Sequence, residues 1–248
     1  MQIRTLKIEE LDLLFLHSKN MGWHNEIILT ISLQKVYPND FFIAYLKNEL
    51  LGFIIALKHS EEVGFISHFL IVKKFRRYGY GKSLFNFALR HLNGRQIALD
   101  SFQETQNFYV EAGFTSYFDV TTYKFSTGSV TLPKQQLNTT RIIKNLNLHN
   151  KNEYIKTILL NKRVTYKAID DKTFAFTFKY RDGYKINIES KDINDAIILF
   201  FELTHHLKPG TNIYLQTTPL YPILEALVKL LKMSTDSKLV RMYNKIIN

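Results

Sequence analysis

Residues 71–84 read Ile71-Val-Lys-Lys-Phe-Arg76-Arg-Tyr-Gly79-Tyr-Gly81-Lys-Ser-Leu84, a basic segment with two glycines. The nearly continuous apolar run before it, residues 63–72, predicts a strand buried on both faces, and residues 82–92 predict a helix with one apolar side. A helix N-terminus presents unpaired N–H groups and the positive end of the helix dipole, and glycines let a ligand approach the backbone closely. The segment therefore predicts a phosphate-binding turn, to which Arg76, Arg77 and Lys82 add positive charge.

Two common nucleotide-binding motifs share features with this turn, and neither is complete. Gly81-Lys82-Ser83 resembles the end of a P-loop, but a P-loop needs a glycine five positions before Gly81, where this chain has Arg76. The dinucleotide-binding motif Gly-x-Gly-x-x-Gly needs a third glycine at the position of Leu84. We therefore expect the turn to bind phosphate in a different context.

The spacing Arg76-x-x-Gly79-x-Gly81 resembles the coenzyme A signature of GNAT-type N-acetyltransferases, Gln/Arg-x-x-Gly-x-Gly/Ala. Phe75 lies where that family often has an aromatic residue. Further along the chain, residues 108–114 read FYVEAGF and resemble the family's later motif, an aromatic-tyrosine pair followed by Gly-Phe.

The resemblance covers residues 1–126 and carries expectations for fold and activity. It implies an α/β fold, layered as in α+β proteins, with a mixed central sheet flanked by helices. It also implies acetyl-CoA as co-substrate, no metal, and transfer of an acetyl group to a primary amine of an unidentified acceptor. That acceptor is either a small molecule or a protein.

The same resemblance implies roles for individual residues. Backbone N–H groups of Arg77–Lys82 would hold the coenzyme pyrophosphate, and the strand before the turn would pair with pantetheine through its backbone. Tyr109 matches the family tyrosine that protonates the departing thiolate, although a packing role for this side chain is the alternative. The implied coenzyme-binding residues are Phe69, Leu70, Ile71, Arg76, Arg77, Tyr78, Gly79, Tyr80, Gly81 and Lys82.

The sequence defines the acceptor side less closely. Trp23 and His24 follow the first predicted helix, in the loop where the implied fold often builds the acceptor pocket. His68 is a candidate for substrate contact or for the general base, and Asp100 and Glu104 are other candidate bases. A water relay or an already neutral amine would need no base, and a core role for His68 or an anchoring role for Trp23 is the alternative. No His, Asp or Glu cluster has the spacing of a metal site.

The chain is expected to form two α/β halves, a coenzyme-binding domain over residues 1–126 and a smaller domain over residues 137–248. The linker over 127–136 contains most of a Ser/Thr/Gly-rich segment that ends in Pro133. The second half resembles the degenerate GNAT-like module of tandem members, because its elements follow the order of residues 50–125. Its expected helices are at 152–161, 193–207 and 220–233, and its expected strands are at 173–180, 184–189, 212–217 and 239–243. The coenzyme signature is missing between Glu189 and Ile193, so coenzyme binding by this half is doubtful.

Charge is concentrated in the second half, with a net of +9 over residues 127–248 and +2 over residues 1–126. A basic field favours anionic partners, although a lysine-rich solvated surface explains the same charge. The alternative to the enzyme is therefore a non-catalytic protein that binds acyl-CoA or, through its basic half, nucleic acid.

Other absences narrow the function classes. The chain has no cysteine, which excludes a disulfide scaffold and a cysteine nucleophile. Its first residues carry acids where a signal peptide needs a basic and then an apolar stretch. It has no run of ~18 apolar residues. We expect a cytoplasmic protein without membrane association, and the oligomeric state stays open.

Overall fold

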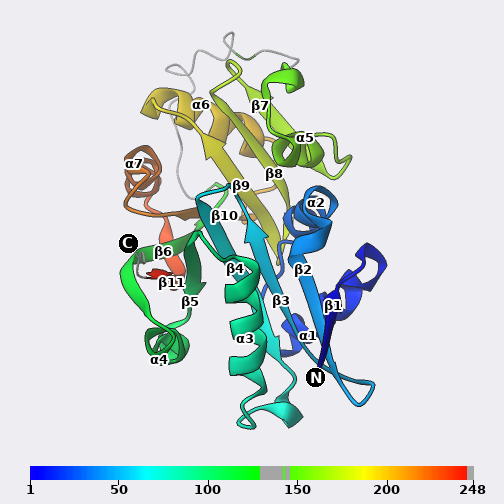
Figure 1. Ribbon diagram of the computed structural model, residues 1–248. Helices are drawn as coiled ribbons and strands as arrows, with labels where there is room; N and C mark the ends of the chain where they lie inside the picture. The colour runs from blue at the N-terminus through cyan, green and yellow to red at the C-terminus, as the bar shows by residue number, and fades with distance from the viewer. Residues whose placement is uncertain (129–141, 143–145, 245–248) are drawn as a thin grey trace. The chain divides into compact units, whose positions relative to one another are not determined.

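The computed structural model describes residues 1–128, 142 and 146–244, which form two compact units (Figure 1). Unit 1 consists of Met1–Phe118 and Leu239–Asn248, and unit 2 consists of Asp119–Lys238. These limits differ from the expected domains 1–126 and 137–248, because the last segment of the chain packs in unit 1. Most of the expected linker, from residue 129 onward, lies outside the described residues.

Unit 1 is a mixed α/β unit whose sheet has the strand order β1-β2-β3-β4-β5-β11. Strands β4 and β5 run parallel, and the other neighbours in this order are antiparallel. Helix α3 forms the crossover between the two parallel strands. The elements are β1 (Gln2–Thr5), α1 (Leu11–Asn20), α2 (Ile27–Val36), β2 (Phe41–Leu46), β3 (Glu49–Lys58), β4 (Val63–Ile71), α3 (Tyr80–His91), β5 (Gln96–Ser101), α4 (Gln106–Glu111), the start of β6 (Phe114–Ser126) and the end of β11 (Ser234–Asn244).

Hydrophobic alternation determines which helices cover each face of this sheet. Ile54 of β3 packs with Leu84 and Phe85 of α3 in one cluster. The preceding residue, Phe53, packs with Leu14 of α1 in a second cluster. Because successive strand residues point to opposite faces, α3 and α1 lie on opposite sides of the sheet. Burial of each such side chain contributes about 1.5–3 kcal/mol.

The C-terminal strand β11 extends the sheet of unit 1 beyond β5. Residues Val240–Tyr243 pair antiparallel with Ala98–Ser101. Met242 is fully buried in the cluster that also contains α3. The side-chain oxygen of Asn244 accepts a hydrogen bond of 2.7 Å from the N–H of Ile97. The last described residues of the chain are therefore part of the core of unit 1.

Unit 2 repeats the strand arrangement of unit 1. Its order is β6-β10-β9-β8-β7, with β9 and β10 parallel and the other neighbours antiparallel. Helix α6 connects the parallel pair, as α3 does in unit 1. The added elements are α5 (Glu153–Leu159), β7 (Val164–Ala168), β8 (Phe174–Tyr180), β9 (Gly183–Glu189), α6 (Ile193–Thr204), β10 (Asn212–Thr217) and α7 (Pro222–Leu230).

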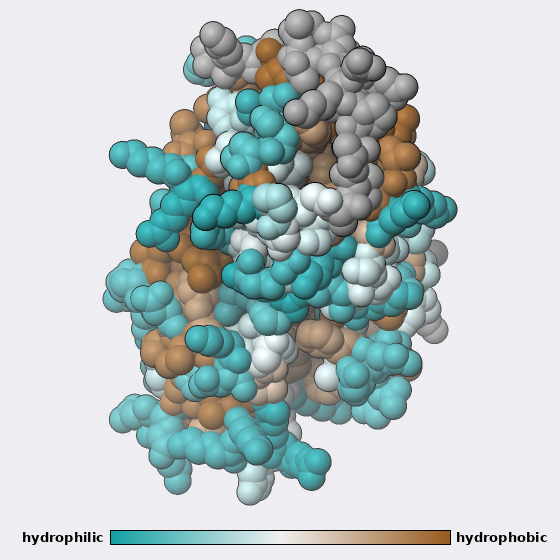
Figure 2. All heavy atoms as spheres, turned by 180° about the vertical axis from the view of Figure 1, so that it is seen from behind, coloured by the Kyte–Doolittle hydropathy of each residue, from teal (hydrophilic) through white to brown (hydrophobic). Residues whose placement is uncertain are grey.

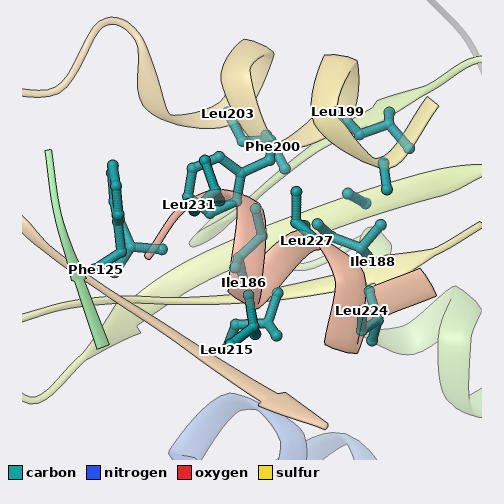
Figure 3. Packing of buried hydrophobic residues seen from close by; sticks show 14 of the residues in the cluster. Phe125, Ile186, Ile188, Leu199, Phe200, Leu203, Leu215, Leu224, Leu227 and Leu231 are labelled. Atoms are coloured by element: carbon teal, nitrogen blue, oxygen red, sulfur yellow. The ribbon is translucent and has the colours of Figure 1, made fainter. Parts of the chain in front are cut away.

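The core of unit 2 lies between one face of its sheet and helices α6 and α7 (Figure 3). Phe200 and Leu203 of α6 and Leu227 of α7 pack there with Ile186 of β9 and Leu215 of β10. All five side chains are at most 1% exposed. This core leaves the opposite face of the sheet to a different set of side chains.

Several elements differ from the sequence-based expectation, among them β11, which begins at Ser234 instead of residue 239. Strand β7 was not expected: its sequence VTYKA does alternate apolar and polar residues, but the segment is only five residues long. Helix α3 begins at Tyr80 instead of residue 82, directly after Gly79, whose φ is 81°. Helix α7 begins at Pro222 instead of residue 220, since proline suits the first turn of a helix.

The surface mixes hydrophilic side chains with small hydrophobic patches, as Figure 2 shows for one face. Large apolar side chains such as Leu16, Leu160 and Leu220 are individually exposed. Over the described residues, no helix combines the length and the apolar character that crossing a membrane requires.

Gly52 of β3 lies where the backbones of β3 and β4 approach closely, and alanine at this position tests that approach. A Cβ there would overlap the carbonyl oxygen of Leu70 and come within 3.0 Å of a side-chain carbon of Ile71. We expect Gly52→Ala to lower the free energy of unfolding by about 1–3 kcal/mol, measured by urea denaturation. The control is Gly81→Ala, whose Cβ would meet its nearest atoms at an ordinary 3.6 Å. Equal stability of Gly52→Ala and the unaltered protein would contradict the close approach.

Candidate active site

Strand β4 leads through one 3-10 turn, Lys73–Phe75, to the start of α3. Nε of Arg76 donates a hydrogen bond of 2.8 Å to the carbonyl oxygen of Ile71, which ties the turn back to the strand. Arg77 and Gly79 have left-handed backbone, with φ of 68° and 81°. Gly79 is the N-cap of α3 and brings no capping side chain. The turn therefore leaves the N–H groups at the helix start to other acceptors.

The first turn of α3 combines N–H donors with positive charge. The N–H groups of Tyr80, Gly81 and Lys82 have no acceptor inside an α-helix, whereas the N–H of Ser83 donates to the Gly79 carbonyl at 3.1 Å. The side chain of Lys82 is exposed beside them. An anion at this position would gain from the helix dipole and from the lysine charge.

In the turn before α3, Gly81 packs close to β4 and Tyr78 is exposed to solvent. A Cβ at Gly81 would lie 3.6 Å from side-chain atoms of Phe69 and Ile71, so the bare Cα keeps the helix start close to β4. Tyr78 is 73% exposed, with its ring 6.4 Å from that of Tyr80. The expected coenzyme-binding residues of the turn are thus brought together at one end of β4.

Strands β4 and β5 stop pairing before either strand ends. Their parallel register runs from Val63 opposite Gln96 to Ile66 opposite Leu99. Beyond this point β5 pairs on its other side with β11, and no described strand pairs with β4 on the β5 side. The two strands diverge, and residues 67–71 present a backbone edge that an extended ligand can pair with.

A β-bulge marks the point of divergence. The register between β3 and β4 shifts between Phe53 and Ile55, so that Ile54 faces two residues, His68 and Phe69. His68 has a φ of 48°, which is uncommon outside glycine and accompanies the extra residue of a bulge. The bulge bends β4 at the residue where its pairing with β5 has just ended.

The three residues expected to pair with pantetheine lie in this diverging segment. The side chains of Phe69 and Ile71 pack in the cluster of α3, and Leu70 packs in the cluster of α1. The side chains of these residues pack in the cores on the two faces of the sheet. Only their backbone edge is therefore available to a ligand.

Tyr109 of α4 lies in an aromatic cluster beside β4. Its ring centroid is 5.5 Å from that of Phe85, 5.2 Å from Phe108 and 6.4 Å from Phe114. Phe108 in turn lies 5.6 Å from Phe69 of β4. Burial raises the pKa of Tyr109 to about 12, so its hydroxyl keeps its proton throughout the neutral range.

His68 is a weak proton acceptor in this structure. Burial lowers its pKa to about 4, and the charge of Glu26 offsets only part of that effect. Its Nδ1 lies 3.3 Å from the hydroxyl oxygen of Ser67. A base that titrates near pH 4 is poorly matched to an ammonium whose pKa is ~10, so the structure does not favour His68 as the general base.

The loop between α1 and α2 carries the expected acceptor residues Trp23 and His24. The Trp23 ring lies 6.3 Å from that of Phe102, which directly follows β5 and is 42% exposed. A terminal nitrogen of Arg76 lies 2.8 Å from the sulfur of Met21 in the same loop. The loop therefore contacts both the turn before α3 and the residue that follows β5. Sequence reasoning missed Phe102, whose only signal was an aromatic residue two positions after the strand predicted over 96–100.

The other candidate bases differ in their surroundings. Asp100 forms a forked ion pair with Arg241 of β11, in which one of the two bonds is 3.1 Å long. The Arg241 guanidinium also lies 5.1 Å from the ring centroid of Phe65 and 5.9 Å from that of Phe118. Asp100 is thus held in a structural contact, while Glu104 is exposed. Among the described residues, no His, Asp and Glu side chains gather as a metal site would require.

Unit 2 has the corresponding helix but a different N-terminus. The side chain of Asp192, the N-cap of α6, accepts hydrogen bonds from the N–H groups of Asn194 at 2.8 Å and Asp195 at 3.0 Å. A carboxylate of the chain itself therefore uses the donors that α3 leaves to a ligand. This agrees with the absence of the coenzyme signature from the second half.

A sequence profile of the acetyltransferase (GNAT) family matches residues 8–114, from the start of the first helical segment to the beginning of β6. Residues 8–114 belong to the GNAT family. The matched range contains the diverging strands, the turn between β4 and α3, and Tyr109 of this GNAT domain.

A curated relative shares sequence with part of this chain. Holothin acyltransferase of Pseudoalteromonas sp. (strain SANK 73390) is 24% identical over 148 residues, 59% of this chain and 47% of that protein. This chain therefore spans about half the length of the curated relative it matches.

Solved structures share the arrangement over nearly the whole chain. A proposed acetyltransferase from Pyrococcus horikoshii has a TM-score of 0.75 at 14% identity, covering 99% of this chain and 90% of that one. A tandem GNAT protein from the clavulanic acid biosynthesis pathway has a TM-score of 0.63 at 9% identity, covering 98% and 97%. The expected tandem GNAT fold is confirmed, and nothing in these likenesses supports a nucleic-acid-binding protein.

The neutral state of His68 predicts a specific dependence of stability on pH. Its folded pKa of about 4 lies below the unfolded value of 6.5, so the contribution is present above pH 6.5 and is lost as the pH falls to 4. We expect the unaltered protein to lose up to about 3 kcal/mol of unfolding free energy from this residue. His68→Asn, which tolerates left-handed backbone, should remove that loss in urea denaturation between pH 7 and pH 4. The exposed His59→Asn is the control, and identical profiles for His68→Asn and the unaltered protein would refute the assignment.

Proposed function

We propose that this chain is an N-acetyltransferase that transfers the acetyl group of acetyl-CoA to a primary amine. The divergence of β4 and β5 beside the start of α3 is the observation that carries the proposal. Around it lie an open strand edge, a set of helix N–H donors and a protonated tyrosine, in a domain of the GNAT family. The name of the acyltransferase relative supports the same reaction class.

The residues of unit 1 fit acetyl-CoA in two respects. The N–H groups of Tyr80–Lys82, with the charges of Arg77 and Lys82, suit its pyrophosphate. The backbone edge over Phe69–Ile71 suits its pantetheine arm, whose amides can add to a sheet as a strand does. Both features lie at the same end of β4, as a ligand with a phosphate group and an extended arm requires.

The reaction joins the acceptor nitrogen to the acetyl carbonyl carbon and breaks the carbon–sulfur bond. The thiolate leaves with the electron pair of that bond, and Tyr109 donates its proton to the sulfur. The nitrogen releases one proton to water as the amide forms, and the Tyr109 phenolate takes a proton back from water. Positioning of amine and thioester supplies most of the acceleration, and Trp23 and Phe102 border the acceptor side. An amine that has lost its proton to water needs no side-chain base.

Removal of the Tyr109 hydroxyl separates chemistry from coenzyme binding. We expect Tyr109→Phe to bind acetyl-CoA as the unaltered protein does, while turnover falls by roughly 10²–10⁴-fold, because general acid catalysis is lost. Turnover is measured by thiol release with a panel of primary amines. Tyr117→Phe, an exposed tyrosine of β6, is the matched control and should retain full activity. Full activity of Tyr109→Phe would remove Tyr109 from the mechanism.

The phosphate-binding turn is tested by calorimetric titration with acetyl-CoA. We expect the unaltered protein to bind and the double variant Arg76→Ala, Gly81→Glu to show no binding, because it loses the contact that ties down the turn and gains a negative charge beside the N–H groups. Arg90→Ala, near the other end of α3, should bind normally. A well-folded unaltered protein that does not bind acetyl-CoA would overturn the proposed function.

A further inference from the structure

Unit 2 contains a second divergence of parallel strands, lined by different side chains. Strands β9 and β10 pair up to Ile186 opposite Leu215, and both strands continue beyond that pair. The next residues are Asn187 on β9 and Gln216 on β10. Two amide side chains therefore stand where the strands begin to separate.

These amides share one face of the sheet with Lys185. Ile186 and Leu215 belong to the core beneath α6 and α7, so their neighbours along the strands point to the opposite face. Asn187, Gln216 and Lys185 are here called the Lys185 cluster. Lys185 is 2% exposed, whereas Asn187 and Gln216 are half-buried as residues, with the Nδ2 atom of Asn187 itself buried.

Lys185 brings a buried positive charge to the cluster. Its Nζ donates a hydrogen bond of 3.2 Å to the side-chain oxygen of Gln216 and lies 5.5 Å from the ring centroid of Tyr180. Because Gln216 accepts through its oxygen, its NH₂ group adds further donors. A buried ammonium beside amide donors is suited to an anionic oxygen.

Asn187 holds a donor with no acceptor. Its Nδ2 is the one buried side-chain nitrogen or oxygen among the described residues without a hydrogen-bond partner. An unpaired buried donor is energetically unfavourable. A ligand, ion or water that accepts a hydrogen bond from Nδ2 would remove this cost.

The neighbouring polar groups on unit 2 are paired with one another. The hydroxyl of Tyr214 donates to Asp182 at 2.6 Å, and the side chain of Asn212 donates to the same carboxylate at 2.7 Å. Arg181 pairs with Asp236 at 2.6 Å. The unmet donor is thus specific to the diverging strands.

Phenylalanines of β8 frame the Lys185 cluster. Phe178 lies opposite Lys185 and Phe176 lies opposite Asn187 in the antiparallel register, and both are buried. Their rings are stacked, with centroids 6.4 Å apart and planes 23° apart. A ligand with a charged oxygen at the cluster would therefore place any apolar body against aromatic rings.

We propose that the diverging strands of unit 2 bind a small carboxylate with an apolar body. Asn187 donates to its oxygens, Lys185 adds a positive charge beside them, and the apolar body lies beside Phe176. Asp192 already uses the N-terminal donors of α6, so unit 2 employs its strand divergence for a ligand without the phosphates of the coenzyme.

Calorimetric titration of the full chain with benzoate tests this proposal. We expect saturable binding of one benzoate, and at least tenfold weaker binding of benzamide, which has the same shape without the charge. Lys185→Met should weaken benzoate binding at least tenfold. Lys179→Met removes an exposed lysine of β8 and should leave it unchanged. Equal binding of benzamide and benzoate, or equal losses in the two lysine variants, would overturn the proposal.

Asn187→Leu gives an independent readout that does not depend on the lysine. It should abolish benzoate binding and also raise the unfolding temperature of the ligand-free protein, because an unpaired donor is replaced by an apolar group of similar size. A lower unfolding temperature would show that Asn187 has a structural role and would refute its role as a ligand donor.

Two further measurements show whether the carboxylate belongs to the acceptor and whether this site depends on the proposed acetyl transfer. If the carboxylate is part of the acceptor, benzoate raises the KM for the amine in the thiol-release assay. If it is a distinct ligand, that KM does not change, and either result supports the site. Lys185→Met should bind acetyl-CoA normally, so a failure of acetyl-CoA binding by the unaltered protein would affect the proposed function and not this site.

Discussion

Beyond Ile66 and Leu99, β4 and β5 form no further hydrogen bonds with each other, and the site of unit 1 is arranged around that gap. A parallel pair that remained bonded to its ends would offer no backbone edge to an extended ligand. The bulge at His68 adds one residue to β4 and bends it where the pairing ends. The turn, the start of α3 and Tyr109 then lie near an edge that a coenzyme arm can pair with. The left-handed backbone of His68 is a local cost that the surrounding core must offset.

Strand β5 pairs with β4 along one edge only as far as Leu99, and β11 pairs with its other edge. Arg241 holds Asp100 at the end of β5, and its guanidinium also packs on Phe65 of β4 and Phe118 of β6. One side chain from the end of the chain therefore connects three strands of unit 1. Since Met242 is also buried there, residues 1–126 alone would lack part of their core and would expose a strand edge. The first half of the chain consequently depends on the second half for its fold.

Local features were predictable from the sequence and non-local ones were not. The turn followed from glycines between an apolar run and a helix, because positive φ and helix starts depend on neighbouring residues. The repeat followed from the order of elements. The position of β11 beside β5 could not be predicted from the sequence. Residues 98–101 and 240–243 pair in antiparallel orientation, but neither segment contains a pattern that identifies the other as its partner. The low pKa of His68 and the burial of Lys185 could not be predicted either. Both depend on burial, which tertiary packing determines, and lysine side chains are usually exposed.

The two units differ most at a single capping residue. In unit 1 the N-cap of α3 is Gly79, which has no side chain, so the first N–H groups stay available to an external phosphate. In unit 2 the N-cap of α6 is Asp192, whose carboxylate already accepts two of those bonds. A phosphate approaching α6 would have to displace a tethered carboxylate and bear its negative charge. Both units nevertheless keep a parallel pair that separates before its ends. The strand divergence and a helix start without a capping side chain are therefore separable parts of the fold, and unit 2 retains the first without the second.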